Sequence, residues 1–144
     1  MDVSELRKRI LRGIDEARRD ASTRRGTVDE ARKAYEEFLV RIAAPMFRQV
    51  AGILKAETQP HEVHTPAETV RLVSEQSPHT YIEIELDVTR AEPAVIGRVS
   101  LAHGRQGHLV EERVIGNGRA IAELTEEDVA AFLVAETPKL VVKP

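Results

Sequence analysis

Tyr81-Ile82-Glu83-Ile84-Glu85-Leu86-Asp87-Val88 is the stretch that decides the fold. Apolar and polar side chains alternate along it, which is the period of a β-strand with one buried face and one face in water. A second β signal follows from Val95 to His103, and a third from His108 to Ile115. The short glycine-bounded segment 104–107 joins these two signals as a hairpin loop. The centre of the chain therefore predicts an antiparallel sheet.

Weaker signals extend the sheet on its N-terminal side. Residues 62–65 and 70–74 fit short strands, and Ser77-Pro78 and Ala91-Glu92-Pro93 fit turns. Gly97 shares a strand face with Val95 and Val99, where a missing side chain admits a bulky neighbour or a bulge. The result is an antiparallel meander of four or five strands.

A helix is predicted after the last strand. Thr125 is a plausible N-cap, because Glu126, Glu127 and Asp128 follow it near the positive end of the helix dipole. Val129, Phe132 and Leu133 provide an apolar face that can cover the sheet, and Thr137-Pro138 should end or kink the helix.

The first part of the chain predicts helices. Apolar residues recur at steps of three or four, which places them on one stripe of a helix: Leu6, Ile10, Ile14, Ala17 and Ala21. The pattern breaks between Ser22 and Thr27, and Thr27 with Glu30 fits a capping box that opens a second helix, so a helical hairpin is expected. Pro45 should kink or restart this second helix, which ends near Ala56.

The fold class is therefore α+β: an N-terminal helical hairpin or arm, an antiparallel meander and a covering C-terminal helix. Thr58-Gln59-Pro60 separates a helical arm, residues 1–57, from a sheet-plus-helix unit, residues 61–144. A chain of 144 residues has the size of one ordinary domain, so we expect one cooperative unit.

Composition narrows the possible functions. The absence of cysteine excludes disulfides, thiol catalysis and Cys-ligated metals, and fits a reducing compartment, so a cytoplasmic protein is expected. No apolar run reaches the length of a membrane helix. Three Phe, two Tyr and no Trp argue against sites that depend on stacking. Abundant Ala, Val, Arg and Glu are typical of bacterial proteins.

Charge is divided unevenly along the chain. Residues 1–60 carry 13 Lys and Arg against 10 Asp and Glu, and the remainder carries 8 against 14. The first helix supplies candidate partner-binding cations: Arg7, Lys8, Arg12, Arg18, Arg19, Arg24 and Arg25. They favour either contacts with nucleic-acid phosphates or solvated faces that attract the acidic second half.

Three other patterns are candidate sites. Glu83, Glu85 and Asp87 share one strand face, and they fit either a cation site or an outer face paired with Arg71, Arg98 and Arg113. Gly116-Asn117-Gly118 fits a plain turn better than a phosphate loop. His103 and His108 face each other across the predicted hairpin as weak metal candidates, although no third ligand is near them.

No catalytic motif, cofactor motif or catalytic residue emerges. The leading hypothesis is a non-catalytic interaction or adaptor module that self-associates through its N-terminal helices as a homo-oligomer, without membrane contact. The alternatives are nucleic-acid binding by the basic first helix and a small-ligand pocket between the sheet and the C-terminal helix.

Overall fold

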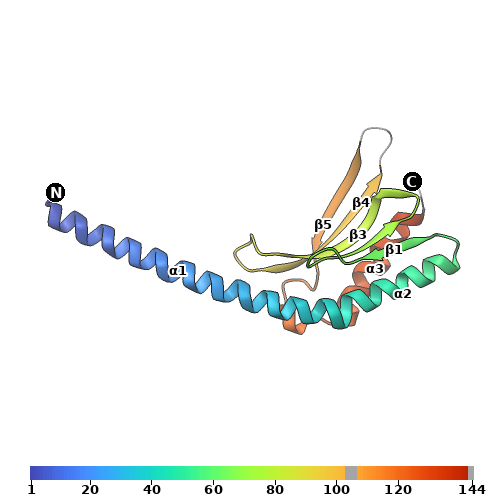
Figure 1. The fold of residues 1–144 in the computed structure, drawn as a ribbon, viewed down its shortest axis with the longest axis horizontal. Coiled ribbons are helices and arrows are strands. Elements are labelled where there is room, and N and C mark those ends of the chain that lie inside the picture. The colour runs from blue at the N-terminus through green and yellow to red at the C-terminus, as the bar shows by residue number, and fades with distance from the viewer. Residues whose placement is uncertain (103–106, 143–144) are drawn as a thin grey trace.

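The computed structural model describes residues 1–102 and 107–142. It confirms the α+β class: a long N-terminal helix leads into a five-stranded antiparallel sheet, and a C-terminal helix follows (Figure 1). The strands are β1 (His61–His64), β2 (Val70–Ser74), β3 (Ser77–Asp87), β4 (Ala94–Ala102) and β5 (His108–Val114). They pair in chain order, so the sheet is the predicted meander.

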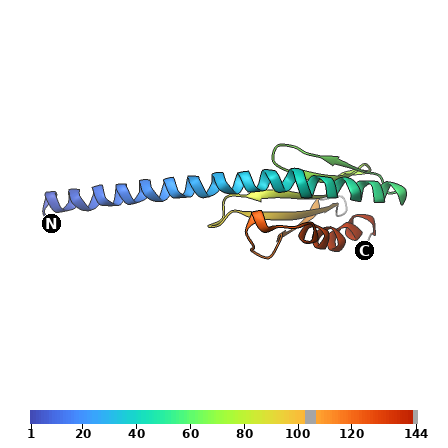
Figure 2. The same cartoon turned by 90° about the horizontal axis from the view of Figure 1, so that it is seen from below.

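The helical part consists of α1 (Val3–Phe38), a π-helical turn (Leu39–Ala43) and α2 (Ala44–Ala56). The predicted hairpin turn between Ser22 and Thr27 is wrong, because α1 continues through it (Figure 2). Glycine in a helix interior costs only about 1 kcal/mol relative to alanine. In addition, the Thr27 hydroxyl donates to the Thr23 carbonyl at 3.1 Å, within the helix, and so does not cap a new one.

Regular α-helical geometry is interrupted next to Pro45, as expected. Proline has no N–H group to donate to the preceding turn, and it lies in the first turn of α2, directly after the π-helical turn. Whether the helical arm and the sheet-plus-helix unit unfold cooperatively stays a prediction.

One face of the sheet carries the core. α2 packs against β1 and β2, while α3 (Glu126–Val141) packs against β3 and β4, so the helices form one layer and the sheet a second layer. All three phenylalanines are buried there, together with Tyr35 and the inward residues of the strands. The Tyr35 hydroxyl donates to the Glu68 carbonyl at 2.6 Å and lies 3.2 Å from the Ile84 carbonyl, which fixes α1 on the sheet. Burial raises the pKa of this phenol.

Two proline predictions need correction. Ser77 and Pro78 belong to β3, because the chain reverses at residues 75–76 and the β2–β3 register shifts beside Ser74. α3 continues past Pro138 to Val141, so the proline does not end the helix at its own position, although it has no N–H to donate to the preceding turn. The Thr125 cap is confirmed: its backbone N–H donates to the Asp128 carboxylate at 2.8 Å.

Candidate interaction site on the helical arm

The first 23 residues of the chain form an overhang. Every one of them is exposed, and Figures 1 and 2 show this part of α1 extending beyond the sheet and the other helices. We call residues 1–23 the overhang, and residues 24–142, where described, the body. The overhang is thus the part of the predicted arm in which no residue is buried by the rest of the described chain.

Large apolar side chains lie bare on the overhang. Exposed fractions are 80% for Val3, 46% for Leu6, 53% for Ile10, 48% for Leu11 and 40% for Ile14. Single exposed apolar residues are common on protein surfaces, but here the stripe that was predicted from the sequence is uncovered along its whole length.

The bare stripe continues a buried one. Counting from Ile10 in steps of four and three residues leads through Ala17 and Arg24 to Tyr35 and Phe38, which are buried against the body. Residues at these steps share one face of a helix. The same face of α1 is therefore covered by the sheet in its second half and by nothing in its first half.

Arg24 marks the boundary between the two halves. Its guanidinium donates to the carbonyls of Ala91 at 2.5 Å and Arg90 at 2.6 Å, and also to the Val88 carbonyl. These bonds attach α1 to the β3–β4 loop. Arg24 was predicted as a partner-binding cation, whereas the structure uses it within the chain.

The other predicted cations are spread around the overhang. Steps of four and seven residues place Lys8, Arg12 and Arg19 on the face opposite the apolar stripe, with Asp15 and Glu16 between them. Arg7 and Arg18 lie on a flank of the overhang, and Arg25 lies just beyond it, in the body. Acidic neighbours interrupt the positive charge, so the overhang presents no continuous basic surface.

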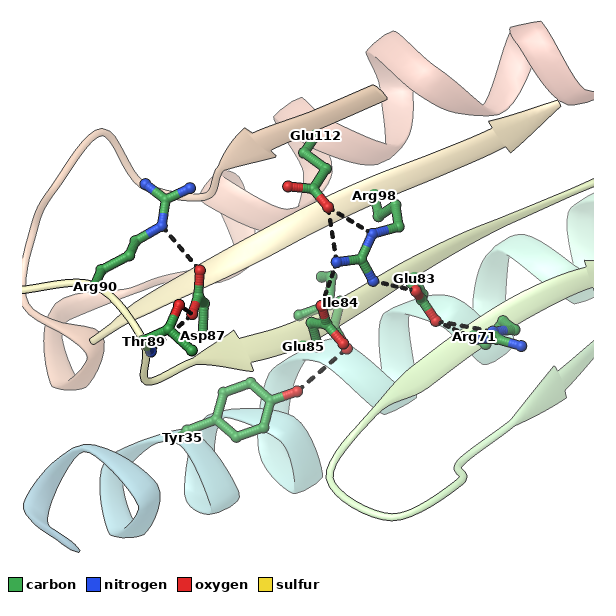
Figure 3. Close-up of polar contacts among 10 residues, drawn as sticks. All are labelled: Tyr35, Arg71, Glu83, Ile84, Glu85, Asp87, Thr89, Arg90, Arg98 and Glu112. Atoms are coloured by element: carbon green, nitrogen blue, oxygen red, sulfur yellow. Dashed lines mark hydrogen bonds and ion pairs between the residues drawn. The ribbon is translucent and has the colours of Figure 1, made fainter. Parts of the chain in front are cut away.

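The outer sheet face holds a paired charge network rather than an open row of carboxylates (Figure 3). Glu83 accepts from Arg71 at 2.8 Å and from Arg98 at 2.5 Å, and its side chain is only 3% exposed. Arg98 also contacts Glu85, and it reaches Glu112 at 2.8 Å. The hydrogen bond that Arg98 donates to Glu85 is the largest of the effects that raise the Arg98 pKa, so the guanidinium stays charged.

Two residues that were grouped with this network lie elsewhere. Asp87 accepts from the Thr89 hydroxyl at 2.6 Å and the Thr89 N–H at 2.9 Å, which lowers its pKa and shapes the β3–β4 loop. Arg113 is opposite Gly97 in the ladder, and therefore on the helix-facing side. Its guanidinium lies 5.1 Å from the centre of the Phe132 ring.

The histidine candidates are only partly described. His103 lies outside the described residues, and the backbone of His108 pairs with Ala102 at the start of β5. Within residues 1–102 and 107–142, no three metal-ligating side chains come together. Gly116, Asn117 and Gly118 all have positive φ and form a turn closed by the Arg119 N–H on the Gly116 carbonyl at 3.1 Å.

The expected small-ligand pocket between the sheet and α3 is largely filled. The hollows that border Phe132 there measure about 70 and 210 Å³, below the roughly 300–1,000 Å³ of typical ligand pockets. A cleft of about 700 Å³ lies instead between the β3–β4 loop and residues 118–121. Both arginines that line it, Arg90 and Arg119, are already paired with carboxylates.

Comparison with family models, with curated proteins and with solved structures found no match to this chain. In the part of the chain that the structure describes, none of the helices combines the length and the apolar character needed to cross a membrane.

The sequence missed the property that makes the overhang a site. Periodicity revealed the apolar stripe, but the expected hairpin divided the arm at residues 22–27 and did not show that the stripe extends beyond the body on one long helix. The continuous run of helix-compatible residues through Gly26, with no proline before Pro45, was the signal that favoured one long helix.

Proposed function

We propose that this chain is a non-catalytic interaction module that associates with other copies of itself through the overhang. The observation that carries the proposal is the bare apolar stripe of α1. Exposed apolar surface of this kind favours association with another apolar surface, because burial removes it from water. Every copy of the chain carries the same stripe, so self-association needs no further partner.

The polar clusters of the body support the non-catalytic part of the proposal. Glu83 and Glu85 are paired with Arg98, Asp87 is held by Thr89, and Asp128 is held by Thr125. These side chains form internal contacts that stabilise strands, a loop and a helix cap. None of these paired groups is left open toward a cleft as an acid, a base or a nucleophile.

The test is the mass of the full-length chain in solution, compared between two double variants. Ile10→Gln with Ile14→Gln places amides in the stripe without changing charge, and should convert an oligomer into a monomer. Arg12→Gln with Arg19→Gln places the same side chains on the opposite face and should keep the native mass. Light scattering on a sizing column measures the mass of each variant. A native-like mass for the Ile10/Ile14 variant would contradict the proposal.

The same pair of variants separates this proposal from nucleic-acid binding, which stays a prediction. Binding to phosphates falls steeply with salt and depends on the arginines, so it would be weakened by the Arg12/Arg19 variant and not by the Ile10/Ile14 variant. Apolar self-association should instead be weakened by the Ile10/Ile14 variant and not by the Arg12/Arg19 variant. High salt should not dissociate the oligomer.

A further inference from the structure

The length of the overhang restricts how a second copy can cover it. Residues 1–23 are exposed, and the body begins at Arg24, where the β3–β4 loop meets α1. Two helices that overlap over these residues in opposite directions place residue 1 of one copy beside residue 23 of the other. The bare stripe runs from Val3 to Ala21 and is centred near residue 12, so this register covers each stripe along its whole length, between the two bodies.

A parallel overlap is obstructed by the body. The stripe face of α1 that is bare in the overhang is the face that packs on the body from Arg24 onward, as the burial of Tyr35 and Phe38 shows. A parallel partner helix would lie on that face at the usual 8–10 Å, and its continuation would occupy the volume of the β3–β4 loop and the sheet. In the antiparallel overlap, the two bodies lie at opposite ends and on opposite sides of the helix pair.

The side chains also suit an antiparallel overlap. With residue 1 beside residue 23, Val3 lies opposite Ala21 of the other copy and Ile10 lies opposite Ile14. Large residues near the N-terminus therefore meet small ones near the body, and the seam has an even thickness. On the flanks, Leu11 of the two copies meet near the centre, and Arg9 comes beside Glu16 of the other copy.

We propose that two copies pair through their overhangs in antiparallel orientation, with the two-fold axis near residue 12. This inference rests on the proposed self-association and adds its geometry. The face of α1 that packs on the body within one chain is thus the same face that forms the interface between the two overhangs. The pairing separates the bodies, so that each presents its sheet and its cleft at one end of the dimer.

The absence of native cysteine allows a direct test on the full-length chain. Ser4→Cys and Ser22→Cys each give one site for a nitroxide label, and both serines are exposed. They are five helical turns apart, so they project from the same side of α1. Pulsed electron paramagnetic resonance then measures the distance between labels in each variant alone and in a mixture of the two.

The two orientations predict opposite results. Given 1.5 Å per residue, labels at Ser4 in the two chains of the antiparallel pair are offset by about 24 Å along the axis, and labels at Ser22 by about 30 Å. Ser4 of one chain is offset from Ser22 of the other by only about 3 Å along the axis, so these two labels are separated mainly by the width of the helix pair. Only the mixture gives a short distance. In a parallel pair, each variant alone gives a short distance and the mixture adds one near 27 Å.

The outcomes distinguish the antiparallel orientation from the proposed self-association on which it rests. A dimeric mass with a short distance only in the mixture supports antiparallel pairing. A dimeric mass with short distances in the single variants overturns the orientation and leaves self-association standing. A dimeric mass with long distances throughout shows pairing through another surface and overturns the inference. A monomeric mass overturns both.

Discussion

Gly97 is the residue on which the packing of α3 depends. A Cβ atom at this position would lie 2.5 Å from Cε1 and 2.7 Å from Cζ of Phe132, and 2.9 Å from Cδ1 of Ile115. The Phe132 ring therefore occupies the space that a side chain would fill. The missing side chain was predicted to admit a bulky neighbour, and this is confirmed.

Gly97→Ala should destabilise the body by about 1–3 kcal/mol, because the ring must leave a well-packed position. Urea unfolding followed by circular dichroism measures the change. Gly26→Ala is the matched control, since a Cβ there meets nothing within 4 Å and alanine favours the helix interior. The Gly26→Ala variant should be slightly more stable than the native protein. Equal midpoints for the two variants would contradict the packing of Phe132 on Gly97.

At the scale of elements, the strands were predicted well because their signal is local. Alternation over Ile82–Asp87 requires only one buried face, and the meander follows from short turns. The helical hairpin failed because a weak helix former such as Gly26 does not decide between a turn and a continuous helix. Tertiary bonds from Arg24 to the β3–β4 loop help to decide it, and no local pattern reveals them.

For the candidate site too, the sequence predicted what depends on local pattern and missed what depends on tertiary contacts. Periodicity placed the apolar stripe of Leu6, Ile10 and Ile14 correctly, whereas its exposure depends on where the sheet ends along α1. Cross-strand pairing of Glu83 with Arg71 and Arg98 was expected, but the burial of Glu83 was not. Alternation identifies a polar face without showing how closely paired side chains cover it.

The network on β2, β3 and β4 gives a prediction at this scale. Glu83→Gln removes the charge that two arginines share and should destabilise the protein by about 3 kcal/mol, because breaking a buried ion pair leaves unpaired charge. Glu85→Gln is the matched control on the same strand. Its carboxylate is 34% exposed, so the loss should be about 1 kcal/mol or less. Urea midpoints of the two variants provide the comparison, and similar losses would contradict the shielding of Glu83.

At the scale of the whole molecule, the overhang connects folding to association. A helix of this length without tertiary contacts is marginal in water, because most helix stability in proteins comes from packing of the apolar face. Every residue of the overhang is exposed within its own chain. Its helicity should therefore depend on the pairing of two copies, whereas the body is held by its own core.

Dilution should consequently unfold the overhang and leave the body folded. The helical signal at 222 nm should fall by roughly 30% as the dimer dissociates, since about that share of the helical residues lies in the overhang. The near-ultraviolet signal of the buried tyrosine should stay unchanged. The Ile10→Gln, Ile14→Gln variant should show the low signal at every concentration, and the Arg12→Gln, Arg19→Gln variant should follow the native curve. A concentration-independent signal in a chain whose mass changes on dilution would show that the overhang is helical by itself, and would separate its folding from its association.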